Sequence, residues 1–151
     1  MEVYRISHKD YSKVLSSAGS SNRWNYEGEY VIYTGSSRSL STLELIVHRN
    51  SIKKLPDYEM MILSIADEDN LMEQILIKKL PANWRSFTSY FKLQKIGSAW
   101  YKKQSSLVLK VPSAVIPKEY NYIINTKHPT FNTNVLLVRN EEYFFDERLF
   151  E

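Results

Sequence analysis

The chain has 151 residues, the usual size of one domain, and is long enough to bury a core without disulfides or metals. It contains no cysteine, which excludes a disulfide framework, a thiolate nucleophile and a cysteine metal site. Its net charge of +3 comes from scattered lysines and arginines, without the clustering typical of nucleic-acid binding. We therefore expect one domain over residues 1–151, with no bound metal and no direct nucleic-acid contact.

The N-terminus predicts neither secretion nor insertion into a membrane. Residues 1–5 lack the charged and then apolar pattern of a signal peptide. No apolar run approaches the ~20 residues that are needed to span a bilayer. We expect a cytoplasmic protein.

The first half of the chain predicts three short strands. Runs of β-branched, aromatic and apolar residues are typical of strands, and such runs occupy residues 3–6, 30–33 and 59–65. The serine-rich segment 7–21 has little helical pattern, so we expect a loop between the first two strands.

One helix is predicted between the second and third strands, over residues 39–49. Ser39 precedes the apolar run as an N-cap, and leucine and valine then recur at helical spacing. Glu44 lies beside this apolar stripe, where a carboxylate buried against a sheet needs a partner.

The second half predicts further strands and the end of a second helix. We expect a helix end with Trp100 as a core anchor, and a strand that stops at Pro112 and leaves Ser113 just beyond its end. The predicted ranges are 96–103 for the helix end and 107–111, 122–124 and 135–138 for the strands; segment 71–79 is ambiguous. Mixed short strands with few helices and no βαβ alternation indicate an α+β fold.

Three side chains of complementary chemistry follow one another in the short span that holds the second strand and the start of the first helix. Arg23 offers a guanidinium for phosphate, Tyr33 an aromatic ring and Glu44 a carboxylate for a developing cation. Together they suit a site for an anionic, glycosidic ligand. Taken singly, each is equally compatible with a surface arginine, a half-buried strand tyrosine or an ordinary helix glutamate.

The order of motifs along the whole chain resembles the RES domain, named for an arginine, a glutamate and a serine. In this sequence these fall at Arg23, Glu44 and Ser113. Asn22 and Thr126 depart from the pattern, which has glycine and proline there. The matching motifs are Arg23-Trp24-Asn25, Gly28, Tyr33-Thr34, Leu43-Glu44, Val47-His48, Val111-Pro112-Ser113-Ala114, Asn121-Tyr122, Ile124-Asn125, His128-Pro129 and Arg148-Leu149-Phe150.

This resemblance implies the toxin of a RES–Xre toxin–antitoxin pair, with a fold similar to that of ADP-ribosyltransferases. Such toxins act on NAD, chiefly by cleaving its nicotinamide–ribosyl bond. The four glycines never cluster into a dinucleotide fingerprint, so NAD is expected as a substrate and no cofactor is expected. The implied partner is an Xre-type antitoxin that covers the active site, and a homodimer is also compatible with the family.

The resemblance also implies a set of site residues. Glu44 is expected to stabilise the oxocarbenium-like ribose, as carboxylates do in glycoside cleavage. Arg23, Tyr33 and Ser113 complete the expected catalytic group, in which Ser113 binds phosphate or positions Glu44. The expected substrate-binding residues are Arg5, Trp24, Asn25, His48, Asn121, Tyr122 and Asn125.

Several alternatives stay open at this level. Either Arg5 or Arg23 is expected to hold the phosphate, and Trp24 and Tyr122 are equally compatible with a place in the core. The acceptor of the ADP-ribosyl group is water, phosphate or a protein, and a protein acceptor makes the chain a mono-ADP-ribosyltransferase. A non-catalytic, DNA-contacting module is a further rival, against which the scattered charge argues.

Overall fold

The computed structural model describes residues 1–48 and 57–150. Seven strands form one mixed sheet within these ranges, in the order β4-β5-β6-β2-β1-β3-β7. Only β4 and β5 run parallel, and the other neighbouring pairs are antiparallel. The strands are β1 (Glu2–His8), β2 (Val31–Gly35), β3 (Tyr58–Ile65), β4 (Met72–Gln74), β5 (Val108–Pro112), β6 (Tyr120–Asn125) and β7 (Val135–Glu142).

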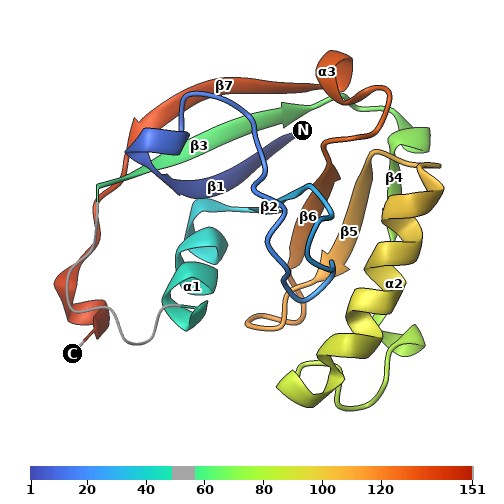
Figure 1. Ribbon diagram of the computed structural model, residues 1–151. Coiled ribbons are helices and arrows are strands. Elements are labelled where there is room, and N and C mark those ends of the chain that lie inside the picture. Colours follow the sequence, from blue (N-terminus) through green and yellow to red (C-terminus); the bar gives the residue numbers. More distant parts are fainter. Residues whose placement is uncertain (49–56, 151) are drawn as a thin grey trace.

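The sheet is divided at the boundary between β1 and β2. Within these two described strands, Tyr4 and Gly35 are the only registered pair, whereas β1 and β3 are paired over seven positions. Figure 1 shows β1, β3 and β7 diverging from the ladder that contains β5 and β6. The two strands are therefore paired at one place only and diverge from there.

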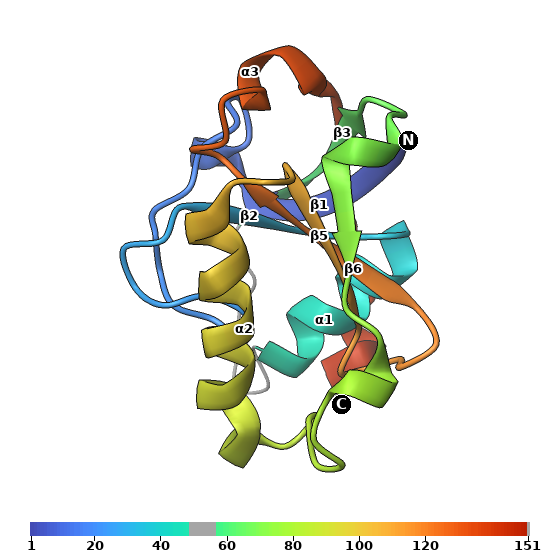
Figure 2. The ribbon, with the colours of Figure 1, turned by 90° about the vertical axis from the view of Figure 1, so that its right-hand side faces the viewer.

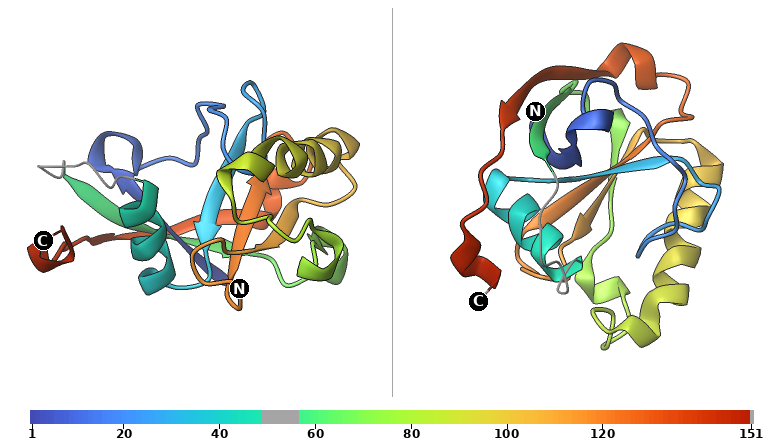
Figure 3. Two further views of the ribbon diagram at one scale, coloured as in Figure 1. Left: turned by 90° about the horizontal axis from the view of Figure 1, so that it is seen from below. Right: turned by 60° about the vertical axis from the view of Figure 1, so that its left-hand side comes forward.

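Three helices accompany the sheet in the described part of the chain: α1 (Arg38–His48), α2 (Tyr90–Lys103) and the short α3 (Phe131–Asn134). Helix α2 lies along the ladder of β5 and β6 (Figure 2), and α1 lies below the division of the sheet (Figure 1). Seen from below, α1 and α2 stand on different parts of the sheet (Figure 3). Short 3-10 helices occupy Lys9–Tyr11, Asp69–Leu71, Ile77–Lys79, Phe87–Ser89 and Glu147–Phe150.

Two apolar clusters hold these layers together. One joins side chains from both parts of the sheet, among them Val3, Ile32 and Leu63, so the two ladders cannot separate without exposing it. The other lies under α2 and contains all three tryptophans with Leu93 and Ile123. Trp100 is buried in this second cluster, as the sequence predicts.

The α+β class predicted from the sequence is confirmed, and the predicted strands and the first helix match observed elements. The polar segment 7–21 is largely a loop, although β1 extends to His8. The ambiguous segment resolves into the short strand β4 between two 3-10 helices. The predicted helix end over residues 96–103 is the last part of α2, which begins at Tyr90, and Arg49 lies outside the described residues. Among the described residues, no helix has the length and apolarity to cross a bilayer.

Candidate active site

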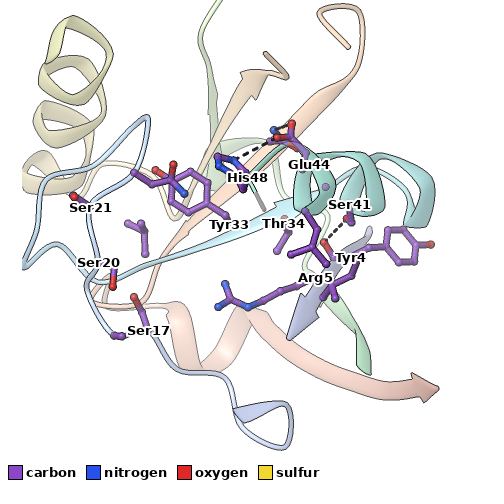
Figure 4. Close-up of a pocket in the computed structure, with 17 residues that line it drawn as sticks. Tyr4, Arg5, Ser17, Ser20, Ser21, Tyr33, Thr34, Ser41, Glu44 and His48 are labelled. Atoms are coloured by element: carbon purple, nitrogen blue, oxygen red, sulfur yellow. Dashed lines mark hydrogen bonds and ion pairs between the residues drawn. The ribbon is translucent and has the colours of Figure 1, made fainter. Parts of the chain in front are cut away.

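A cavity of about 500 Å³ lies where β1 and β2 diverge. Both strands contribute to its wall, together with α1, the loop that precedes β2, and Asn121 of β6. Figure 4 shows Arg5 extending from β1 toward Tyr33 and Ser17, while Glu44 and His48 enter from α1. Residues far apart in the sequence thus meet at the division of the sheet.

Two hydrogen bonds fix the Glu44 carboxylate. The Ser113 hydroxyl and the Asn121 side-chain amide each donate to Glu44 Oε1, both at 2.7 Å. The other oxygen, Oε2, lies 3.8 Å from His48 Nε2, one helical turn further along α1. Since the Glu44 side chain is 20% exposed, it is oriented by the protein and still reaches the cavity.

Ser113 is a positioning residue in this arrangement. Its side chain is fully buried, and its Oγ also accepts hydrogen bonds from the backbone N–H groups of Val115 and Ile116, each at 3.0 Å. Position 113 follows the last residue of β5, as the sequence predicts, and its own N–H donates to the Glu119 carbonyl. The turn therefore aims one hydroxyl proton at the Glu44 carboxylate, and no histidine among the described residues hydrogen-bonds the Ser113 hydroxyl as it would in a nucleophilic relay.

Tyr33 lines the cavity, but its hydroxyl group is already engaged. It donates to Asn25 Oδ1 at 2.6 Å and accepts from the Trp24 backbone N–H at 3.0 Å. Burial raises the pKa of Tyr33, which keeps the phenol protonated as a donor. The ring of Tyr33 is consequently held rigidly, and a ring in such a position suits stacking on a planar ligand.

Arg5 is the cationic side chain of the cavity. Its guanidinium forms no hydrogen bond or ion pair with any residue that the structure describes. Burial lowers the pKa of Arg5, because removing a charge from water without a partner disfavours the charged form. Arginine donates in a planar fork that matches phosphate oxygens, so this unpartnered group is suited to an anionic ligand.

Arg23 does not line the cavity. Its Nη1 donates to the backbone carbonyls of Trp84 and Arg85, each at 3.3 Å, and its guanidinium lies over the Tyr90 ring at 4.7 Å. These contacts join the loop before β2 to the segment before α2. A catalytic role for Arg23 stays a prediction, whereas Arg5 is the arginine that faces the space beside Glu44.

Of the remaining predicted binding residues, two line the cavity and four do not. His48 and Asn121 line the cavity. Tyr122 is buried in the first apolar cluster and Trp24 in the second. Tyr122 points away from the cavity because it follows Asn121 on β6, and successive strand residues point to opposite faces. Asn25 and Asn125 are buried and bond backbone carbonyls. Neither asparagine nor either of these aromatic residues lines the cavity, so direct substrate contact by these four stays a prediction.

A comparison with known families shows where the chain belongs. The model of the RES domain matches residues 2–146 of the chain. The protein belongs to the RES-domain family. The family match and the mixed sheet agree with the expected ADP-ribosyltransferase-like fold.

Individual relatives extend over nearly the whole chain. It is 34% identical to a protein named Toxin Res from Yersinia enterocolitica, over 99% of each sequence. It is 31% identical to a Toxin Res from Photorhabdus laumondii, over 99% of this chain and 97% of the relative. A protein named Prs ADP-ribosylating toxin, from Sphingobium sp., is 33% identical over 76% of this chain and 74% of its own length.

Several lining residues of this RES domain were not singled out by sequence reasoning. Ser17, Ser20 and Ser21 come from the loop before β2, and Thr34 from the strand itself. The serine-rich composition of residues 7–21 was the available signal, but it also fits an ordinary loop. The close approach of that loop to β1 requires the tertiary fold.

Asn22 also lines the cavity, at a position where the RES pattern has glycine. Positive φ does not occur at Asn22, so glycine's conformational freedom is not needed there. Its Oδ1 accepts from the Arg23 N–H at 2.8 Å and its backbone pairs with Asn25. This departure leaves the loop intact.

A metal site has no support in the described residues, where no three histidine or acidic side chains gather at suitable positions. Glu44 with His48 offers two donors, fewer than the three protein ligands of a typical catalytic zinc site. The side chains that line the cavity offer a fixed carboxylate, an aromatic ring and a guanidinium.

Proposed function

We propose that this RES-domain protein is a toxin that degrades NAD by cleaving the nicotinamide–ribosyl bond, with water or phosphate as the acceptor. One observation carries the proposal: a carboxylate fixed by two hydrogen bonds faces the same cavity as a guanidinium that has no hydrogen-bond or ion-pair partner among the described residues. NAD carries both matching groups, an anionic pyrophosphate and a ribose that becomes cationic as its glycosidic bond breaks. The names of the relatives from Yersinia and Photorhabdus support a toxin.

The chemistry follows from these charges. As the bond between ribose C1′ and the pyridinium nitrogen breaks, both bonding electrons go to that nitrogen, so neutral nicotinamide leaves without a general acid. The positive charge that develops on the ribose is stabilised by Glu44, whose orientation is set before the substrate arrives. Water or phosphate then forms the new bond at C1′, and a proton is released when water attacks. Tyr33 supplies a rigid ring for nicotinamide, and Arg5 a contact for phosphate.

The first test is nicotinamide release from NAD by the purified, antitoxin-free chain, with and without phosphate. We expect Glu44→Gln to lower the rate by a factor of at least about 100, because the amide keeps the shape of the side chain and loses the charge that stabilises the transition state. Glu68→Gln is the matched control, since Glu68 is exposed and lies outside the cavity lining. An active Glu44→Gln variant, or a folded wild type that releases no nicotinamide, contradicts the proposal.

The alternative is ADP-ribosyl transfer to a cellular protein, favoured by the name of the Sphingobium relative, Prs ADP-ribosylating toxin. Transfer requires the same cleavage and differs only in the nucleophile that reaches C1′. Mass spectrometry of a lysate treated with the toxin and NAD separates the two functions. Free ADP-ribose or its phosphorylated form supports degradation, and a modified protein supports transfer.

The proposal includes an Xre-type antitoxin that covers the cavity, and a cytoplasmic site of action, where NAD is found. A free NAD-degrading enzyme would harm its own cell, so we expect the purified complex to release nicotinamide at least tenfold more slowly than the free toxin. Equal rates for the complex and the free toxin would rule out this mode of neutralisation. Analytical ultracentrifugation of the free toxin from the same preparation tests whether it forms the expected homodimer.

A further inference from the structure

The two oxygens of the Glu44 carboxylate have different surroundings. Oε1 accepts hydrogen bonds from Ser113 and Asn121, both at 2.7 Å. Oε2 accepts no hydrogen bond from any residue that the structure describes, and it lies 3.8 Å from Nε2 of His48. Since two donors already share the negative charge of Oε1, Oε2 is the oxygen that is left to meet a cationic group.

His48 is placed to compete for that oxygen. It follows Glu44 by one turn of α1, and both side chains line the same cavity (Figure 4). The His48 side chain is 47% exposed, so its ring exchanges protons with water. Histidine ordinarily changes its charge between pH 5 and 8. Beside Oε2, the ring is therefore either a neutral neighbour or a cation.

The charged groups around His48 leave Glu44 as its anionic partner. Glu44 is the one acidic side chain among the described residues that line the cavity, and Arg5 adds a positive charge there. Tyrosine in the lining stays neutral below pH 8. Arg38 and Glu141 pair with each other at the end of α1 that lies away from His48. The complete set of other ionisable side chains in the cavity and on α1, with the strand residue that pairs with the helix, is Tyr4, Arg5, Tyr33, Arg38 and Glu141.

We propose that His48 controls the reactive oxygen of Glu44. The neutral imidazole leaves Oε2 to the cationic ribose, whereas the imidazolium pairs with Oε2 and slows the cleavage. His48 exchanges one proton with solvent and forms no bond to the substrate in this step. Because positive charge develops on the ribose in the transition state, an ion pair that neutralises Glu44 raises the barrier. This inference rests on the proposed function and adds a residue that regulates it.

The pH dependence of nicotinamide release tests this role. Free imidazole is about nine-tenths protonated at pH 5.5 and almost wholly neutral at pH 8, so we expect the wild-type kcat to be about tenfold higher at pH 8. His48→Gln carries no charge and His48→Lys carries one throughout, so kcat of each is expected to change less than about twofold over this range. At pH 8, kcat of His48→Lys is expected to be at least about tenfold below that of His48→Gln. His8→Gln is the matched control, since His8 does not line the cavity, and it is expected to keep the wild-type ratio.

A second measurement does not depend on activity. The thermal unfolding midpoints of the wild type, His48→Gln, Glu44→Gln and the double variant form a cycle that isolates the ion pair. We expect the two substitutions to be non-additive by about 1–2 °C at pH 5.5, since a half-exposed pair on one helix stabilises weakly, and additive at pH 8. The same midpoints verify that each variant folds.

Three results would each overturn the inference: a wild-type kcat that stays level between pH 5.5 and 8, a His48→Gln variant that keeps the wild-type slope, or additive unfolding at pH 5.5. Failure of the proposed function looks different. A wild type that releases no nicotinamide at either pH, but shows the coupling at pH 5.5, contradicts the proposed function and not the pairing of His48 with Glu44.

Discussion

At the scale of single residues, the site combines a satisfied anion with an unsatisfied cation. Glu44 has its hydrogen-bond partners in place, whereas Arg5 has none among the described residues. A partly buried charge without a partner is costly, and such costs are tolerated where a ligand supplies the partner. We therefore expect the two residues to contribute differently: Glu44 is already oriented by the protein, and Arg5 gains its hydrogen-bond partner when an anionic ligand binds.

Arg5→Met tests this difference between stability and function. We expect the KM for NAD to rise at least about tenfold, because a charge-assisted contact to phosphate is lost. The thermal unfolding midpoint is expected to stay equal or rise, since an unpaired charge is replaced by an apolar side chain of similar length. Steady-state kinetics and thermal unfolding measure both, with Arg139→Met on β7 as the control.

An unchanged KM in Arg5→Met would show that Arg5 does not contact the substrate. A fall in the unfolding midpoint would mean instead that its guanidinium stabilises the folded chain. Arg5→Lys keeps the charge without the planar fork, so we expect a KM between those of the wild type and Arg5→Met.

At the scale of elements, α1 is held in place on two sides, which fixes the position of Glu44. Ser41 Oγ donates to the Tyr4 carbonyl of β1 at 3.0 Å. At the other side, Arg38 donates twice to Glu141 at the end of β7, both at 2.8 Å. Gly35 permits this approach, because a Cβ at that position would lie 2.6 Å from Ser41 Oγ. The helix that carries the carboxylate is therefore tied to both strands flanking β3.

The Arg38–Glu141 pair predicts a pH dependence of stability. Hydrogen bonds from Arg38 lower the pKa of Glu141 from 4.5 to about 2. Because the folded-state pKa is depressed, the contribution of the pair is complete above about pH 4.5 and is lost as the pH falls toward 2. We expect Glu141→Gln to be less stable than the wild type at pH 5, and the difference to disappear near pH 2.

Urea unfolding midpoints at pH 5, 4, 3 and 2 measure this convergence. The pair is exposed, so the difference at pH 5 is expected to be small. Glu68→Gln, which removes a carboxylate without such a partner, is expected to follow the wild type throughout. A gap between Glu141→Gln and the wild type that persists at pH 2 would contradict the assignment.

At the scale of the whole molecule, the cavity depends on how the loop before β2 is clamped between the sheet and α2. The backbone of Trp24 lies directly against α2 at Gly97, where an added Cβ would lie 1.7 Å from the Trp24 carbonyl oxygen. Gln94 also donates from α2 to the carbonyls of Asn22 and Asn25. Since Asn22 lines the cavity, the packing of α2 also fixes one wall of the site.

Gly97→Ala is expected to destabilise the protein by about 3 kcal/mol, because a methyl group cannot enter this contact without moving the backbone. The free energy of unfolding in urea measures the effect. Ala99→Ser is the control, since it adds one atom to an exposed position of the same helix. A loss below about 0.5 kcal/mol for Gly97→Ala would show that the loop yields easily.

The sequence by itself determined the family, the α+β class and most strand positions, and it singled out Glu44 and Asn121, which line the cavity. Local patterns carry that information: strand runs, a serine N-cap, a proline at a strand end and the order of the RES motifs. Only the tertiary structure decided that Arg5, rather than Arg23, lines the cavity beside Glu44. It also decided that Trp24 and Tyr122 are buried in the core and that α1 is tied to β7. The physical reason is that the direction in which such a side chain points depends on contacts between segments that are distant in the chain. The hydrogen bond from Arg23 to the Trp84 carbonyl is one example. No local periodicity of the sequence encodes contacts of this kind.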